Sequence, residues 1–173
     1  MKQILFCVVA ILISFAAHAM KVEVHGSTIY ASGPVEDDLG KFQAGMDQPG
    51  VDKVVFVNSP NGDLWTGMTV GRLIAKRGIN TVIAGNCSSA CSIMFMGGKE
   101  RSFSDAFRPA MTYIGIHGAH SEETKTVDSV LQPQIFAFYK QRMSDRFNAV
   151  VMNTALCDMD DAGAGSGANR AVR

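Results

Sequence analysis

The chain has 173 residues, of which 47% are hydrophobic and 18% charged, and its formal net charge at pH 7 is zero. This length and apolar content suffice for one domain with a buried core and exclude a chain that is disordered throughout. The 16 basic residues balance 16 acidic ones, so no excess of positive charge indicates nucleic acid as a partner. The four cysteines are too few for a fold built from disulfides.

Residues 1–19 are typical of a secretory signal peptide. Lys2 precedes an almost wholly apolar run over residues 4–17, which ends in the small-residue sequence Ala17-His18-Ala19. The run is shorter than the roughly 20 residues that a membrane-spanning helix needs, and an uncleaved N-terminal anchor is the alternative. We therefore expect cleavage after Ala19 and a periplasmic or secreted protein, in a compartment where disulfides persist.

Strands and helices are predicted to alternate along the rest of the chain. Residues 22–30 indicate an opening hairpin or a bent strand, and acidic residues 36–38 are expected in the first turn of a helix that ends before Pro49. Buried strands are predicted from apolar runs at 54–57, 81–84 and 111–116. Helices are predicted from apolar spacing over 64–77, 90–96 and 126–156.

This order of elements predicts an α/β fold with a mainly parallel sheet, crossover helices and a long C-terminal helix. Pro133 is the expected position of a kink in that helix. We expect one domain over residues 20–159, followed by a disordered tail over residues 160–173, which lack apolar periodicity.

The loop over residues 58–62 directly follows a predicted buried strand. Pro60 restricts the backbone, whereas Gly62 tolerates conformations that other residues avoid. Such a loop can direct a backbone N–H into a crevice at the carboxyl end of a strand, where ligands bind in α/β sheets. The alternative is an ordinary turn between a strand and a helix.

A second loop, over residues 85–91, lies between a predicted strand and a short helix. A serine at this junction would lie at a helix N-terminus, where N–H groups and the helix dipole stabilise an oxyanion. Position alone does not distinguish Ser88, Ser89 and Ser92. The alternative is a serine that only caps the helix.

A serine nucleophile needs a base, and His117 is the histidine best placed to supply one. It follows a predicted strand and has small neighbours, whereas His25 and His120 lie in polar surroundings. A metal bound by His117 and His120 is not favoured, because no third ligand lies at a suitable spacing. We expect no metal and no cofactor.

Three segments together resemble a known family: residues 58–62, residues 87–98 and Ile116-His117-Gly118. They resemble the Clp-protease-like serine peptidases of the ClpP/crotonase fold, in particular secreted bacterial relatives with a Cys-x-Ser-Ala-Cys segment. The resemblance implies that Ser89 is the nucleophile and His117 its general base. It further implies that Gly62 and Ala90 supply the backbone N–H groups of an oxyanion hole, with Asp158 as the orienting acid of a triad.

The sequence departs from the family pattern at one residue and in one segment. Asn61 stands where the family usually has the first of two glycines, and residues 160–173 match nothing in the family's closing segment. The resemblance predicts an exported serine hydrolase, a peptidase, acting on a peptide or protein substrate. The alternative is a ClpP-like binding or assembly module without efficient catalysis, and a crotonase-type acyl-CoA enzyme is a third hypothesis. We expect a homo-oligomer and no partner ATPase, because ATP is scarce outside the cytoplasm.

Two cysteines flank the predicted nucleophile. We place Cys87 in the turn that follows the strand and Cys91 in the first turn of the helix. The bend between them can bring their Cα atoms into the roughly 4.4–6.8 Å window that a disulfide requires. We therefore predict a Cys87–Cys91 disulfide that braces the turn and leaves Cys157 free, with two buried thiols as the alternative.

Overall fold

The structure, a computed structural model, describes residues 19–119 and 128–157. Its strands form a single sheet in the order β1-β2-β3-β4-β5, and β6 also pairs with β4. The strands are β1 (Lys21–His25), β2 (Thr28–Ser32), β3 (Lys53–Ser59), β4 (Asn80–Ser88), β5 (Arg101–Phe103) and β6 (Tyr113–Gly115). The helices are α1 (Leu39–Met46), α2 (Leu64–Arg77), α3 (Ala90–Met96), α4 (Leu131–Met143) and α5 (Ala149–Cys157).

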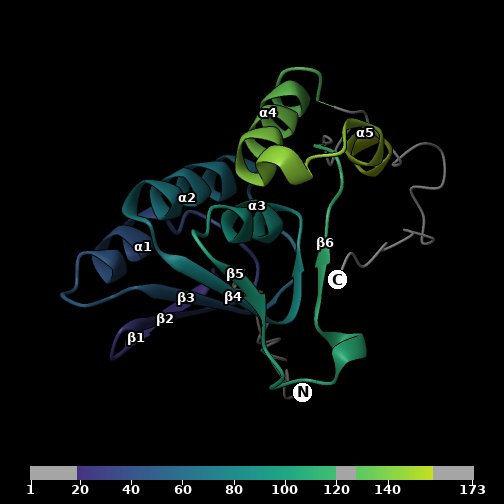
Figure 1. Cartoon of the computed structure of the whole chain (residues 1–173). Helices are drawn as coiled ribbons and strands as arrows, with labels where there is room; N and C mark the ends of the chain where they lie inside the picture. The colour runs from purple at the N-terminus through teal and green to yellow at the C-terminus, as the bar shows by residue number, and fades with distance from the viewer. Residues whose placement is uncertain (1–18, 120–127, 158–173) are drawn as a thin grey trace, which may run out of the picture.

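The predicted α/β class is confirmed. Only the β1–β2 pairing is antiparallel among these strands, and the other pairings are parallel. Helices α1, α2 and α3 lie along one face of the sheet, α4 lies above α2 and α3, and α5 lies beside α4 on the side of β6 (Figure 1). Alternate strand residues such as Ile29, Val54, Phe56 and Ile83 are fully buried beneath the helices. The core therefore lies between the sheet and these helices.

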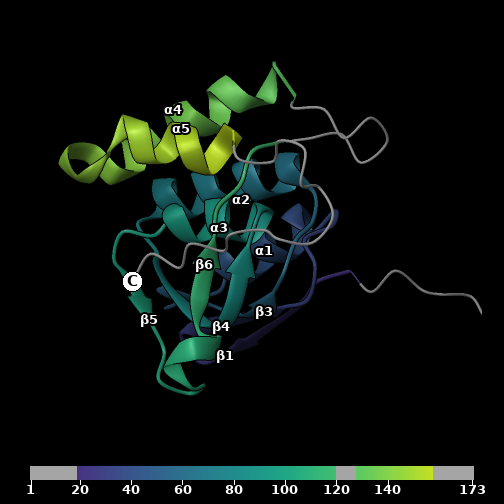
Figure 2. The same ribbon diagram turned by 90° about the vertical axis from the view of Figure 1, so that its right-hand side faces the viewer.

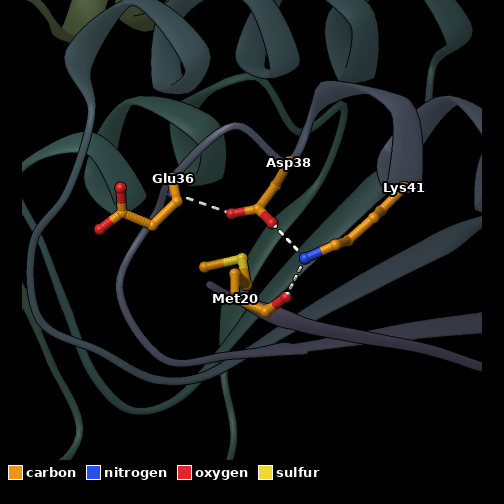
Figure 3. A network of polar contacts seen from close by, with 4 residues as sticks. All are labelled: Met20, Glu36, Asp38 and Lys41. Atoms are coloured by element: carbon orange, nitrogen blue, oxygen red, sulfur yellow. Dashed lines mark hydrogen bonds and ion pairs between the residues drawn. The ribbon is translucent and has the colours of Figure 1, made fainter. Parts of the chain in front are cut away.

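Three acidic residues precede α1 instead of forming its first turn, which corrects one prediction. Asp38 is fully buried at the N-terminal end of α1, and its carboxylate accepts hydrogen bonds from the Glu36 N–H at 2.8 Å and from Lys41 Nζ at 2.6 Å. Lys41 also donates to the carbonyl of Met20 at 2.9 Å (Figure 3). The buried charge is paired and hydrogen-bonded, and it ties the chain before β1 to the segment that leads into α1.

Strand β4 is longer than predicted and pairs with β5 and β6 in addition to β3. Its first half pairs with β5, a strand that the sequence analysis missed, and its second half pairs with β6. Cys87 and Ser88 consequently belong to the strand, not to the turn after it. Figure 2 shows β6 running beside β4 toward the layer of α4 and α5.

The C-terminal helical region is divided, so the prediction of one long helix over 126–156 is wrong. A 3₁₀ turn over Ser144–Arg146 separates α4 from α5, and Ser144 has a φ of 54°, which a helix cannot accommodate. The Asn148 side chain then accepts hydrogen bonds from Val150 N and Val151 N and begins α5. Pro133 lies in the first turn of α4, where the missing N–H costs little.

Several predictions fall on residues outside the described ones. The predicted leader, apart from Ala19, and the predicted tail lie there, as do His120 and Asp158. No helix within residues 19–119 and 128–157 is long and apolar enough to cross a membrane.

Candidate active site

The residues singled out by sequence lie where three neighbouring parallel strands end. The Gly62 loop follows β3, Ser89 follows β4, and His117 comes two residues after β6. Since β4 pairs with both β3 and β6, these three chain segments leave the sheet at its carboxyl edge with Ser89 in the middle. This is the edge at which α/β sheets bind ligands.

Ser89 occupies a strained position between β4 and α3. Its φ of 58° and ψ of −125° lie in a sparsely populated region, which costs of the order of 1–3 kcal/mol for a residue with a side chain. Its side chain makes no capping hydrogen bond to α3, so it does not act as a helix cap. A strained serine between a strand and a helix is the arrangement that presents a nucleophilic hydroxyl in many hydrolases.

The other two serines of this segment are engaged elsewhere. Ser88 Oγ lies 2.6 Å from Asn86 Oδ1 and donates to it. Ser92 is 1% exposed, and its hydroxyl donates to the Ser89 carbonyl at 2.6 Å and lies 2.7 Å from the Tyr139 hydroxyl. The structure thus distinguishes three hydroxyls that position in the sequence left equivalent, and the hydroxyl of half-buried Ser89 is the one that takes no part in these hydrogen bonds.

The predicted Cys87–Cys91 disulfide is present. Its Cα atoms are 5.3 Å apart, and both cysteines are fully buried. Because Cys87 lies in β4 and Cys91 in α3, the bond closes a short loop around Ser89. It therefore joins the two elements whose junction carries the strained residue.

The loop at Gly62 is held by backbone hydrogen bonds to Val35. Val35 N–H donates to the Asn61 carbonyl at 2.9 Å, and Asp63 N–H donates to the Val35 carbonyl at 2.6 Å. In extended backbone, the N–H of the residue between these two faces the opposite side. The Gly62 N–H therefore points away from Val35, and no described residue accepts a hydrogen bond from it.

The close contact with Val35 also requires glycine at position 62. Its φ is 137°, and a Cβ there would overlap the backbone nitrogen and oxygen of Val35. The Asp63 side chain then accepts a 2.7 Å hydrogen bond from Thr66 N and begins α2. The position of the Gly62 N–H is thus fixed by the backbone hydrogen bonds of its neighbours to Val35 and by the capped N-terminus of α2.

Ala90 is the first residue of α3, and its N–H likewise has no acceptor within the described part of the chain. The residue is fully buried against α2, where a Cβ on Gly67 would come within 2.8 Å of the Ala90 carbonyl oxygen. Helix α2 consequently holds the first turn of α3 at backbone contact distance.

The segment after β6 is pinned between α4 and α5. Gln132 Oε1 accepts a hydrogen bond from Ala119 N at 3.1 Å, and its Nε2 donates to the Leu156 carbonyl at 2.8 Å. A Cβ on Gly118 would overlap that same carbonyl. This packing fixes the backbone on the C-terminal side of half-buried His117.

His117 Nδ1 lies 2.9 Å from the carbonyl oxygen of Gly118. A carbonyl only accepts, so Nδ1 carries the proton in this bond, and the lone pair of the neutral ring is then on Nε2. This is the tautomer in which Nε2 can take a proton from a hydroxyl group.

Sequence reasoning missed the residues that support the site from a distance. Gln132 and Tyr139 project from α4, and their partners lie far away in the chain, so no local pattern identifies them. Asn58 is a further case: it has a φ of 47° at an irregularity in β3, and its Oδ1 accepts from Asn86 N at 3.2 Å. Gly85 has no side chain, which leaves room for this contact.

Comparison with known proteins gives similarity at the level of the fold. No protein-family model and no curated protein matches the chain. The solved structure of a mutant of 1510-N, a membrane-bound stomatin-specific protease, is similar with a TM-score of 0.52 at 12% identity, covering 79% of this chain and 72% of that one. A Pseudomonas aeruginosa protein gives a TM-score of 0.48 at 13% identity, covering 80% of this chain and 68% of that one. The first of these similarities shows that the chain shares the α/β fold of that structure.

Proposed function

We propose that this protein is an exported serine hydrolase that cleaves peptides, with Ser89 as nucleophile and His117 as general base. The observation that carries the proposal is the strained turn at Ser89. Two backbone N–H groups near this turn, those of Gly62 and Ala90, have no hydrogen-bond acceptor among the described residues. Strain of this kind persists where the surrounding structure enforces it, and it gathers at active sites. The protease-like fold agrees with this assignment.

The two N–H groups support an oxyanion hole. Val35 lies on the β2 side of the Gly62 loop, so the Gly62 N–H faces the β4 side, where Ser89 directly follows the strand. The Ala90 N–H belongs to the peptide that directly follows Ser89 and lies at the positive end of α3. Removal of one such donor typically costs about 3 kcal/mol of transition-state stabilisation.

The reaction follows the usual order of acyl transfer. Ser89 Oγ attacks the carbonyl carbon of the substrate while His117 Nε2 takes the hydroxyl proton, and the Gly62 and Ala90 N–H groups bind the oxyanion. The imidazolium then donates its proton to the departing amine as the C–N bond breaks. A water molecule then attacks the acyl carbonyl while His117 Nε2 takes its proton, and the imidazolium returns a proton to Ser89 Oγ as the ester bond breaks and the carboxylic acid leaves. Asp158, which lies outside the described residues, is the proposed orienting acid, and in that role it would replace the Gly118 carbonyl as the acceptor of the His117 Nδ1 proton.

Export is part of the proposal and rests on the leader-like residues 1–19 together with the disulfide. A disulfide between fully buried cysteines persists in an oxidising compartment. A peptide or protein substrate follows from the assignment as peptidase, and assembly into a homo-oligomer without an ATPase partner remains part of the same proposal.

Labelling with a fluorophosphonate probe tests the proposal. The probe forms an Oγ–P bond with an activated serine and releases fluoride. We expect one label on Ser89 of the mature protein, none on Ser89→Ala and unchanged labelling of Ser88→Ala, which removes a neighbouring hydroxyl. His117→Ala should slow labelling by about 10²–10⁴-fold.

A folded wild-type protein that does not react, or a Ser89→Ala variant that reacts equally fast, would refute the proposal. The protein would then be better described as a binding module, and native mass spectrometry would show whether it assembles. Hydrolysis of fluorescein-labelled casein by wild type and not by Ser89→Ala would identify the peptide bond as the substrate.

A further inference from the structure

Two buried hydroxyls connect α4 to the backbone at Ser89. Tyr139 on α4 and Ser92 on α3 are each 1% exposed, and their hydroxyl oxygens are 2.7 Å apart. Ser92 Oγ in turn lies 2.6 Å from the carbonyl oxygen of Ser89. The three oxygens form a continuous chain from the outer helical layer to the turn of the proposed nucleophile.

The direction of these hydrogen bonds is determined by the groups that form them. The Ser89 carbonyl only accepts, so the single hydroxyl proton of Ser92 is donated to it. Tyr139 must then donate its own proton to Ser92 Oγ. Burial raises the pKa of Tyr139, and the hydrogen bond to Ser92 offsets this only in part, so the phenol keeps its proton at physiological pH.

The acceptor at the end of the chain belongs to the same peptide group as the Ala90 N–H. No described peptide bond is cis, so the Ser89 C=O and the Ala90 N–H point in opposite directions. The carbonyl also accepts from Ser92 N at 2.9 Å and is therefore directed into α3. The Ala90 N–H consequently points out of the N-terminal end of the helix.

We propose that Tyr139 and Ser92 are positioning residues that orient and polarise the Ser89–Ala90 peptide for oxyanion binding. Hydrogen bonds in a chain strengthen one another, and a peptide whose oxygen accepts a strong bond has a more positive N–H. The α4 helix thereby acts on the reaction without contacting the substrate. This inference rests on the proposed function, because it assigns a role within that same site.

Four variants test the inference by hydrolysis of p-nitrophenyl acetate. Ser92→Ala removes the donor to the Ser89 carbonyl, Tyr139→Phe removes only the outer hydroxyl, and the double variant removes both. Thr81→Val is the matched control: Thr81 Oγ1 donates to the Phe95 carbonyl at 2.7 Å, so it is also a buried hydroxyl bonded to an α3 carbonyl, but at the far end of the helix.

We expect Ser92→Ala to lower kcat by about tenfold at unchanged KM, less than complete loss of an oxyanion donor would. Tyr139→Phe should lower kcat by about threefold, since it weakens the chain without removing the last bond. The double variant should match Ser92→Ala, because Tyr139 acts only through Ser92. The pH dependence of kcat should not change in any of them, and Thr81→Val should remain within twofold of wild type.

The double variant also keeps the test valid if Ser92→Ala folds poorly. Ser92→Ala leaves the buried Tyr139 hydroxyl without its partner, whereas the double variant removes both polar groups and should recover thermal stability. If the double variant regains thermal stability but not kcat, the loss of kcat results from lost positioning of the peptide and not from poor folding.

Three results would overturn the inference: unchanged kcat in Ser92→Ala, an equal loss of kcat in Thr81→Val, or a further loss when Tyr139→Phe is added to Ser92→Ala. Fluorophosphonate labelling distinguishes failure of this inference from failure of the proposed function. If wild type is labelled on Ser89 and Ser92→Ala reacts as fast, the inference alone fails. If folded wild type is not labelled, the proposed function fails, and the inference fails with it.

Discussion

The backbone N–H of Ser89 donates a 3.0 Å hydrogen bond to the carbonyl of Gly115. This bond extends the pairing of β4 with β6 by one residue beyond Ser88, which pairs with Gly115 in the sheet. It ties the turn of the proposed nucleophile to a point two residues before His117. A Cβ on Gly115 would overlap the Ser88 hydroxyl, so the close approach depends on this glycine.

Gly62→Ala should abolish fluorophosphonate labelling. The new Cβ would overlap the Val35 backbone and would strain a φ of 137°, so the loop must move and carry its N–H away. Gly40→Ala in α1 is the control, because a Cβ there would enter open space beside the helix. Circular dichroism should show both variants folded, and labelling of Gly62→Ala at the wild-type rate would contradict the prediction.

Loss of the disulfide should reduce reactivity more than stability. A crosslink that closes so short a loop contributes only about 2 kcal/mol in the chain-entropy model. The Cys87→Ala, Cys91→Ala double variant should therefore still unfold cooperatively in urea but label slowly, because the strained Ser89 turn can relax. Mapping of the non-reduced protein provides the check: two alkylatable thiols at these positions, or a bond from either to Cys157, would exclude the brace.

Gln132→Met should destabilise the protein by about 1–3 kcal/mol. The substitution keeps the length of the side chain but leaves the Ala119 N–H and the Leu156 carbonyl without their partner. Gln134→Met on the same helix is the control, since among the described residues its amide donates only to the Val130 carbonyl one turn earlier. Chemical denaturation should separate the two variants, and equal midpoints would show that Gln132 does not hold the segment after His117.

Ser59→Ala should leave stability unchanged or raise it. Ser59 is fully buried, and its hydroxyl has no hydrogen-bond partner in the described part of the protein, so the alanine variant loses a desolvated polar group and little else. Thr81→Val should cost about 0.5–1.5 kcal/mol, because its hydroxyl bond to Phe95 is lost. The midpoints of thermal unfolding of the two variants test this prediction. A Ser59→Ala variant that is less stable than Thr81→Val would contradict it.

Tyr139 should make the folded state sensitive to alkali. Its pKa is raised by burial above the ordinary tyrosine value of 10.0, so above about pH 10 the unfolded chain releases a proton that the folded chain retains. The stabilisation is fully present below that pH and decreases as pH rises, by up to about 1.4 kcal/mol per pH unit. Urea unfolding between pH 8 and 11 should show a shallower decline for Tyr139→Phe than for wild type, and parallel curves would disprove it.

Elements with strong local signals were predicted closely from sequence. Helix α2 spans Leu64–Arg77 as expected, because its apolar spacing and the left-handed cap at Gly78 are properties of the segment itself. Strand β5 was missed because its three residues carry no pattern, and pairing with β4 determines it. The break at Ser144 was missed for a related reason, since the apolar spacing continues across it.

The sequence by itself determined the α/β class, the loop that carries Ser89 and the disulfide around it, because these depend on patterns and contacts within a few residues. Only the tertiary structure decided which hydroxyls of Ser88, Ser89 and Ser92 are held in hydrogen bonds, whereas the resemblance to a family had already pointed to Ser89 as the nucleophile. Ser92 is bonded to Tyr139, which lies 47 residues further along the chain, and Ser88 is bonded within its own strand. A buried hydroxyl forms its hydrogen bond with the polar group that packs against it, and the packing of elements distant in the sequence determines which group that is.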